Sequence, residues 1–222
     1  MSFNSLDEEN PASLSNCSTL RKIVLNNNAL VGMIPEELDS FSNLLSINFG
    51  ENDLFGTISA SFGNMSSLTK LLLYNARLEG RIPDSLGKLK SLKTFQVSMN
   101  KLSGEIPSSL YNLSSLQYFV AGDNHLPGTL PSNMFNTLPS LRMLLLFGNN
   151  FTRPILISLP NASKFVELDL KGNGFSDMMS LNLDNLKNLY WINLSRNRLE
   201  VNQAKGWDFL AFLTNCTNLE TL

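Results

Sequence analysis

The residues that could perform chemistry are few and lie far apart in the sequence. His125 is the only histidine, so any Ser-His-Asp or Cys-His arrangement would depend on it. Because it directly follows Asn124 at a variable position, we expect a solvated or ligand-touching turn residue rather than a general base. Glu167 and Asp169 have the spacing of neighbouring outward positions on one strand, and a glycosidase pair is conceivable there. Nothing in the sequence buries either carboxyl group, so we interpret both as solvated surface charge and expect no enzyme.

Composition excludes several further classes of site. One histidine and two cysteines exclude a zinc site built from several His and Cys ligands, and no cofactor is expected. The glycine-rich segment near Gly172 lacks the following helix and lysine of a phosphate-binding loop. The net charge of −2, from 17 basic and 19 acidic residues, excludes a strongly basic nucleic-acid-binding protein. No apolar run approaches the ~20 residues of a membrane span, and residues 1–10 do not resemble a signal peptide.

An internal repeat organises the chain. Leucine and asparagine, with 42 and 28 residues, make up about a third of the sequence, unlike an average globular domain. A leucine-centred segment restarts every 24 or 25 residues, and the last unit runs 30 residues. The restarts are Leu20, Leu44, Leu68, Leu92, Leu116, Leu141, Phe165 and Leu189, with partial units over residues 1–19 and 219–222. We predict one solenoid over residues 1–222 that is uncapped at both ends.

The spacing inside each unit predicts its structure. The segment LxxLxLxx alternates apolar and other residues, as a short strand does. In the third unit, Leu71 and Leu73 would point inward, while Lys70, Leu72 and Tyr74 would point outward. One unit cannot bury its apolar face alone, so the units must stack. The predicted fold class is an α/β-type repeat solenoid, curved, with a parallel β-sheet on the concave face and a mostly irregular or short helical convex side.

An asparagine column follows the predicted strands. Its buried side chains would satisfy backbone groups of the turn and of the adjacent coil. The column contains Asn4, Asn28, Asn52, Asn100, Asn124, Asn149, Asn173 and Asn197. The third unit has Ala76 at this position, and the neighbouring Asn75 is out of phase and expected in solvent.

Two segments carry a family resemblance. Residues 32–35, 80–83, 104–107 and 128–131 resemble the GxIP signature of plant-type leucine-rich repeats, although Ser59 replaces the proline of the second unit and the sixth to eighth units lack the signature. In that class, GxIP follows a second short strand and gives the solenoid a superhelical twist. The closing stretch from Trp207, with its NCTxL ending, is similar to a segment of plant receptor-like kinase ectodomains. The group it resembles includes the flagellin receptor, the bacterial elongation-factor receptor and a rice blight-resistance receptor.

The resemblance implies a function for the chain. It implies the ligand-recognition segment of a plant cell-surface receptor kinase in immune or developmental signalling, at the extracellular face of the plasma membrane. A peptide or protein would bind the concave face, with room for a co-receptor, and the membrane span and kinase would lie outside this chain. Two alternatives stay open: a secreted inhibitor similar to polygalacturonase-inhibiting proteins, and a truncated gene product without its own role. The long final unit and the missing cysteine caps favour the receptor.

The two cysteines occupy a repeat position that is apolar elsewhere. Cys17 and Cys216 each lie three residues before a repeat start, so we expect two small buried side chains. Eight repeat starts separate them, or roughly 40 Å at about 4.8 Å per strand, which is too far for a disulfide.

Seven sequons predict glycosylation, in keeping with a secreted glycoprotein. They are Asn16, Asn64, Asn112, Asn150, Asn161, Asn193 and Asn215. Five of them lie four residues before a repeat start, on the predicted convex side, whereas Asn193 falls on the concave strand face. The same Asn-x-Ser sequences also suit a turn into the next strand.

The outward strand positions form the predicted binding surface. They are apolar or aromatic in the third, fifth and sixth units, where a merely soluble surface would be polar. We predict that the ligand contacts Lys70, Leu72, Tyr74, Tyr118, Val120, Met143, Leu145 and Phe147. Lys70, Arg77 and Lys101 on one side and Asp123 on the other would orient a charged peptide. The alternative is that the twist lets some of these side chains cover one another.

Overall fold

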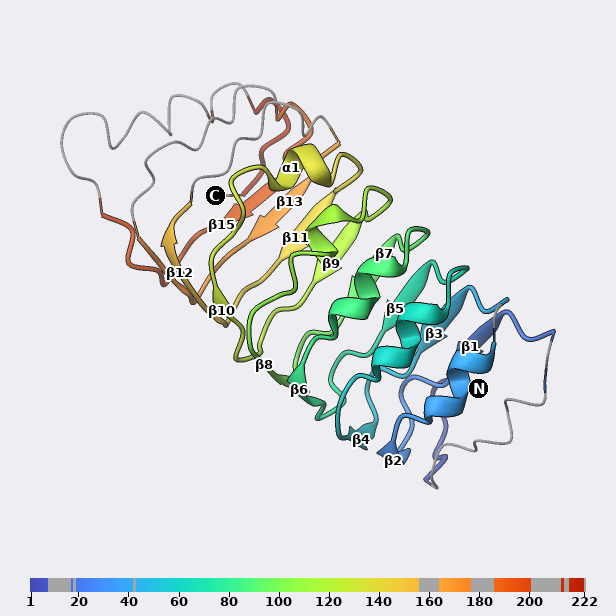
Figure 1. Ribbon diagram of the computed structural model, residues 1–222. Helices are drawn as coiled ribbons and strands as arrows, with labels where there is room; N and C mark the ends of the chain where they lie inside the picture. The colour runs from blue at the N-terminus through green and yellow to red at the C-terminus, as the bar shows by residue number, and fades with distance from the viewer. Residues whose placement is uncertain are drawn as a thin grey trace.

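The computed structural model shows a curved row of stacked units (Figure 1). It describes residues 1–7, 17, 19–41, 43–155, 164–176, 186–200, 213 and 216–221. Eight parallel strands form the main sheet in chain order. They are β1 (Lys22–Val24), β3 (Ser46–Asn48), β5 (Lys70–Leu72), β7 (Thr94–Gln96), β9 (Tyr118–Val120), β11 (Met143–Leu145), β13 (Glu167–Asp169) and β15 (Trp191–Asn193). The predicted solenoid with a parallel sheet is confirmed.

Each main-sheet strand begins two residues after a repeat start. Its middle residue points into the core, as Leu71 does with no exposed surface. Leu71 pairs with Ile47 on one side and Phe95 on the other, so equivalent positions of neighbouring units lie side by side. Outward residues therefore line up in columns along the sheet.

A second set of strands follows the turn in each unit. β2 (Val31–Met33) pairs with β4 (Asp53–Phe55), and β6 (Glu79–Arg81) with β8 (Lys101–Ser103). β10 (Pro127–Gly128), β12 (Asn150–Pro154) and β14 (Gly174–Ser176) form a further row. We expected these strands to end before the glycine of GxIP, which is wrong: β6 contains Gly80. Without a Cβ, Gly80 can take a φ of 76° inside the strand and pass close to Thr57 of the preceding unit.

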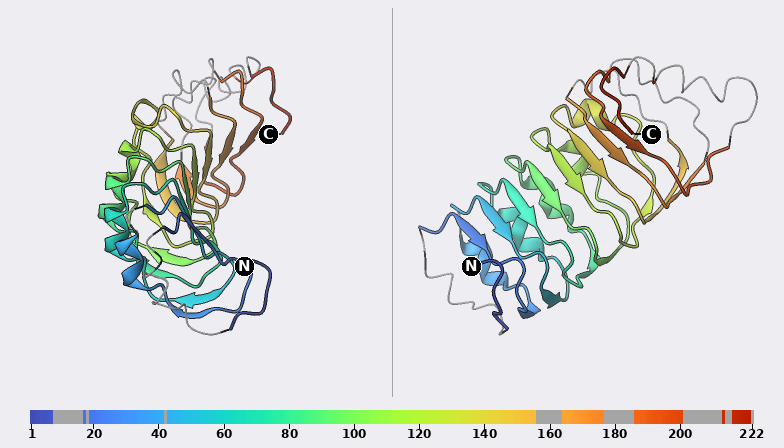
Figure 2. Two further views of the ribbon diagram at one scale, coloured as in Figure 1. Left: turned by 90° about the vertical axis from the view of Figure 1, so that its right-hand side faces the viewer. Right: turned by 180° about the vertical axis from the view of Figure 1, so that it is seen from behind.

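Short helices cover the convex side (Figure 2). η2 (Glu36–Ser40), η3 (Ala60–Asn64), η4 (Asp84–Lys88) and η5 (Leu110–Asn112) are 3-10 helices, and α1 (Met134–Thr137) is one α-helical turn. Pro35 and Pro83 stand at the N-caps of η2 and η4. At the same place before η3, the Ser59 hydroxyl accepts a hydrogen bond from the Ser61 N–H at 3.2 Å. The serine that interrupts GxIP thus caps its helix in another way.

Leucines from successive units fill the space between sheet and helices. Phenylalanines take over part of this core and pair between neighbouring units. The rings of Phe95 and Phe119 are 5.6 Å apart edge to face, and those of Phe151 and Phe175 are stacked at 5.9 Å. The core is therefore continuous along the row rather than closed within each unit.

The two cysteines do not share one environment. Cys216 is buried as expected, but Cys17 is exposed, so the prediction of two core cysteines is wrong for Cys17. The equivalent position in the next unit, Phe41, is 3% exposed, so Cys17 departs from the repeat pattern rather than the pattern from its prediction.

The asparagine column forms a ladder of hydrogen bonds. The Asn124 Nδ2 group donates to the carbonyls of Ala121 and Gly122 in its own turn, at 3.2 Å each, and to Val97 of the preceding unit at 3.0 Å. Its Oδ1 atom accepts from the Leu102 N–H at 2.9 Å. One side chain thereby satisfies four backbone groups and joins two units. The same pattern is made by Asn28, Asn52, Asn100, Asn149, Asn173 and Asn197.

The ladder is interrupted at Ala76. Elsewhere the ladder asparagine accepts from the backbone N–H that lies 22 residues earlier, or 23 residues earlier for Asn149. At Ala76 that N–H would belong to the fully buried Leu54. Ala76 offers no side-chain acceptor to that group. The backbone also changes course: Arg77 takes a φ of 45°, and the Ala76 N–H donates to Asn100 Oδ1 at 3.2 Å.

We predict that Ala76→Asn stabilises the protein by about 0.5–1.5 kcal/mol, the net value of one satisfied buried hydrogen bond. The new Oδ1 atom would accept from Leu54. Chemical denaturation would measure the gain, and amide hydrogen exchange of Leu54 should slow in the variant. Unchanged stability together with unchanged Leu54 exchange would show that this amide already has a partner.

Asn124→Ala is the matched control for that substitution. It removes a complete ladder residue, leaving buried backbone groups without partners at about 1–3 kcal/mol for a lost partner. The free energy of unfolding should therefore fall, and the Leu102 amide should exchange faster. A loss no larger than that of an average surface substitution would mean that the ladder bonds are replaced by water.

Candidate ligand-binding surface

The concave face consists of the outward residues of the main-sheet strands and the residue two places after each strand. Every predicted outward position lies there, because the first and third residues of each strand point away from the core. No described strand or helix covers this face, which lines the inside of the curved row (Figure 2). It is an unpartnered sheet face and hence the surface most available to a ligand.

Seven of the predicted contact residues form a central patch on this face. The central patch is Leu72, Tyr74, Tyr118, Val120, Met143, Leu145 and Phe147, all of them half-buried, while Lys70 beside it is exposed. β9 and β11 place Tyr118 next to Met143, and Val120 next to Leu145. Leu72 and Tyr74 lie on the same face but are separated from β9 by β7, whose outward residues are Thr94 and Gln96. The role of the seven residues in binding stays a prediction.

Two aromatic rings of the central patch already have partners within the fold. The Tyr74 ring lies directly over Gly50, and the Phe147 ring lies directly over Gly122, each in the preceding unit. A Cβ at either glycine would overlap the ring. These two rings thus fill the space left by a glycine of the neighbouring unit, and whether the twist also lets side chains of this face cover one another stays a prediction. Burial, and then the nearby Glu51 carboxylate, raise the pKa of Tyr74, which keeps its phenol neutral.

The acidic pair on β13 differs from its sequence interpretation as solvated charge. Asp169 is only 5% exposed, and burial raises the pKa of its carboxyl group. Its Oδ1 accepts from the Lys171 N–H at 2.9 Å, and the Asn193 side chain also hydrogen-bonds to the carboxylate. Burial, followed by the proximity of Asp169, raises the pKa of Glu167. The sequence missed this burial because Leu145 and Asn193, which flank Asp169, come from neighbouring units.

The described residues contain no arrangement for catalysis or metal binding. His125 is exposed, as expected. No group of three or more His, Cys, Asp or Glu side chains that could hold a metal ion occurs in the described part of the chain. Among the same residues, no helix is long and apolar enough to cross a membrane.

A shallow cleft lies beside the interruption of the ladder. Its volume is about 390 Å³, and its lining is Asn28, Ala29, Glu51, Asn52, Asp53, Asn75 and Arg77. Arg77 forms an ion pair with Asp53 at 2.6 Å. Arg77, which we expected to help orient a charged ligand, has a left-handed backbone, and its guanidinium already has a carboxylate partner. Its role toward a ligand stays a prediction. Asn75 is exposed as expected.

The sequons fall on different faces. Asn64 and Asn112 are exposed at the ends of η3 and η5 on the convex side, and Asn150 is exposed at the start of β12. Asn193 lies on the concave face, where it is half-buried. Asn16, Asn161 and Asn215 lie outside the described residues. Whether any of them carries a glycan stays a prediction.

One exposed apolar group was not identified from the sequence. Met33 and Phe55 are 67% and 53% exposed and lie opposite each other on β2 and β4, with Val31 beside them. The alternation of Val31, Gly32 and Met33 was the available signal, since a short second strand must turn two of these side chains outward. This group lies away from the concave face and serves below as a control surface.

Known proteins with similar sequence or structure support the leucine-rich-repeat fold, but they do not establish what this chain binds. The Leucine Rich Repeat family matches residues 67–89 and 91–113, and no curated protein sequence matches the chain. The chain is similar to the Arabidopsis receptor kinase HAESA, solved with the peptide hormone IDA and the co-receptor SERK1, at 29% identity and a TM-score of 0.86. That similarity covers 96% of this chain and 35% of the HAESA chain.

Two further solved structures show how widely this architecture is used. The plant peptide hormone receptor RGFR1, in complex with RGF2, has 24% identity and a TM-score of 0.69 over 99% of this chain and 45% of the receptor. A plant ice-binding protein has 26% identity and a TM-score of 0.67 over 87% of this chain and 70% of its own. The chain thus spans less than half of the two receptors. It has the leucine-rich-repeat solenoid fold that it shares with these solved structures, among them ectodomains of plant receptors solved with peptide ligands.

Proposed function

We propose that this chain is a ligand-recognition segment of a plant cell-surface receptor-like kinase and that it binds a peptide along its concave face. The observation that carries the proposal is the central patch. Seven outward side chains of three units are apolar or aromatic on a sheet face that no described strand or helix covers. An uncovered apolar surface rimmed by charge is typical of an interaction site.

The resemblance to receptor ectodomains supports a peptide as the ligand. HAESA and RGFR1 were both solved with peptide ligands, and HAESA also with a co-receptor. By analogy, the parent protein would act at the extracellular face of the plasma membrane, in immune or developmental signalling, with a co-receptor as a second partner. The NCTxL ending of the last unit supports the group of the flagellin, elongation-factor and blight-resistance receptors.

Alanine substitutions on two faces test the proposal. Peptides selected against the chain from a random display library should bind Tyr118→Ala and Met143→Ala more weakly by more than ~1 kcal/mol each, as buried interface anchors do. Calorimetry or biolayer interferometry would measure the change. Met33→Ala and Phe55→Ala remove exposed apolar side chains from the other surface and should leave binding unchanged. The proposal is wrong if the control pair abolishes binding while the concave pair is neutral.

A second prediction uses the packing of Phe147 on Gly122. Gly122→Ala puts a Cβ where the ring lies, so the ring must move away from the sheet. Because this aromatic side chain is half-buried and can rotate, we expect the unfolding free energy to fall by at most ~1–3 kcal/mol, the usual cost of overpacking. Peptides selected on the central patch should bind this variant more weakly, whereas Gly63→Ala on the convex side should destabilise without a change in affinity for the folded protein. Retained affinity in Gly122→Ala would show that the Phe147 ring does not shape the surface.

A further inference from the structure

Charges are distributed unevenly along the concave face. On the strands of the main sheet, the basic residues are Lys22 and Lys70 near the N-terminal end, here called the basic end. The acidic residues are Glu167 and Asp169 on β13, here called the acidic end. The three strands between, β7, β9 and β11, carry no charged residue. The face therefore has an electrostatic polarity along the row of units.

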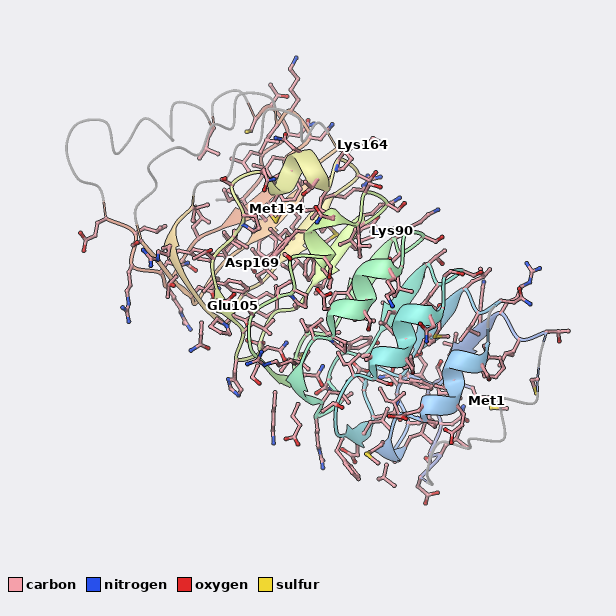
Figure 3. All side chains as sticks on the ribbon, in the orientation of Figure 1. Met1, Lys90, Glu105, Met134, Lys164 and Asp169 are labelled. Atoms are coloured by element: carbon pink, nitrogen blue, oxygen red, sulfur yellow. The ribbon has the colours of Figure 1, made fainter. Side chains whose placement is uncertain are left out.

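These strand charges have no ion-pair partner within the described part of the chain, where Arg77 and Asp53 form an ion pair at the lateral edge. Lys171 lies two residues after Asp169 and moderates the acidic end, but Asp123 adds a further negative charge there. Asp169 is the notable case, because the residue is 5% exposed and burial raises the pKa of its carboxyl group, while no cation lies at ion-pair distance among the described residues (Figure 3). Such burial of a charge is costly unless a partner compensates it.

The separation of the two ends sets the length of a ligand that could reach both. Lys70 and Glu167 lie four strands apart, or about 19 Å at about 4.8 Å per strand. An extended peptide advances about 3.3 Å per residue, so about six residues would bridge that distance. They would run over the central patch, which suits uncharged and partly apolar residues.

From this complementarity we propose that the concave face selects a short extended peptide with an acidic group at one end, an uncharged and partly apolar middle, and a basic group at the other. The basic group lies at Glu167 and Asp169, and the acidic group at Lys70 and Lys22. The proposal rests on the proposed function and adds to it the charge pattern and the placement of the ligand. Burial raises the pKa of both acidic-end carboxyls, and a bound cation would lower it again.

Three synthetic peptides with blocked termini are suitable probes. A dipolar probe has Glu, six uncharged Ser and Leu residues, and Lys; an acidic probe has Glu at both ends, and a basic probe has Lys at both ends. The dipolar probe should bind the full chain at least about threefold more tightly than either other probe, since exposed charge contacts contribute modestly. Lys70→Glu should reverse this order in favour of the basic probe.

Neutral variants and matched controls separate charge from structure. Glu167→Gln with Asp169→Asn keeps the side-chain shapes and should weaken the dipolar probe about threefold without weakening the acidic probe. Lys90→Gln and Glu105→Gln remove exposed charges at the two lateral edges and should change nothing (Figure 3). Urea denaturation of each variant confirms that the protein is folded at the conditions of the assay.

The placement of the peptide has its own measurement. Trp191 pairs with Glu167 across β13 and β15, and Trp207→Phe leaves it as the single tryptophan. A nitroxide on the Lys end of the dipolar probe should quench Trp191 fluorescence, whereas the same label on the Glu end should not.

Binding of the three probes and quenching of Trp191 together decide whether the face has the proposed charge polarity. Preferential binding of the dipolar probe, with quenching from its Lys end, supports it. Equal binding of all three probes, or quenching from the Glu end alone, overturns the charge polarity. If that binding is nevertheless lost in Tyr118→Ala, the proposed function stands without the inference. Failure of the dipolar probe alone, while library-selected peptides still bind the central patch, likewise overturns the inference only.

Discussion

The hydrogen bonds of a ladder asparagine, present in every unit from the first to the eighth except the third, connect the backbone of this protein across its repeats. Backbone bonds between units continue past each three-residue strand into the turn, as from the Asp123 N–H to the Phe147 carbonyl, but they leave other buried groups of the turn to be satisfied by side chains. Each ladder asparagine satisfies such backbone groups with its side chain. Asn124, for example, donates to three carbonyls and accepts from one N–H, and these groups belong to two units. Because the bonds join neighbouring units in the same way each time, they keep the strands in register.

That register determines what the surface can do. Inward positions are restricted to apolar residues, mostly leucine, isoleucine and phenylalanine, by the continuous core, so variation in polarity is left to the outward columns. Side chains in one column meet their counterparts from neighbouring units, as Tyr118 meets Met143. A glycine in a column leaves space that the next residue can fill, which is how Phe147 comes to lie over Gly122. The core therefore restricts the inward residues of each unit, while a few outward residues determine the chemistry of the concave face.

Periodicity predicted the parts of the structure that follow from one unit and its copies. The strand positions, the outward columns and the asparagine ladder all depend on spacing alone, which the 24-residue repeat makes explicit. Other features depend on which side chains of neighbouring units lie next to each other, and the repeat spacing does not specify that. Asp169 is flanked by residues of β11 and β15, which the spacing within one unit does not reveal. The left-handed backbone of Arg77 and its ion pair with Asp53 were likewise not predicted from the repeat.

The departures from the repeat rule are informative in different ways. Ala76 stands where the other units have a ladder asparagine, and the difference is local. The buried Leu54 amide lacks its usual acceptor, and the Ala76 N–H donates to Asn100 instead. Asp169 occupies an outward position of β13, where the repeat does not require a particular residue type. A serine or asparagine there would serve the fold with less electrostatic cost, as Asn193 does one unit later. Asp169 therefore makes the same turn bond as Asn193, but at a higher electrostatic cost, and the proposed basic group of a ligand would offset that cost.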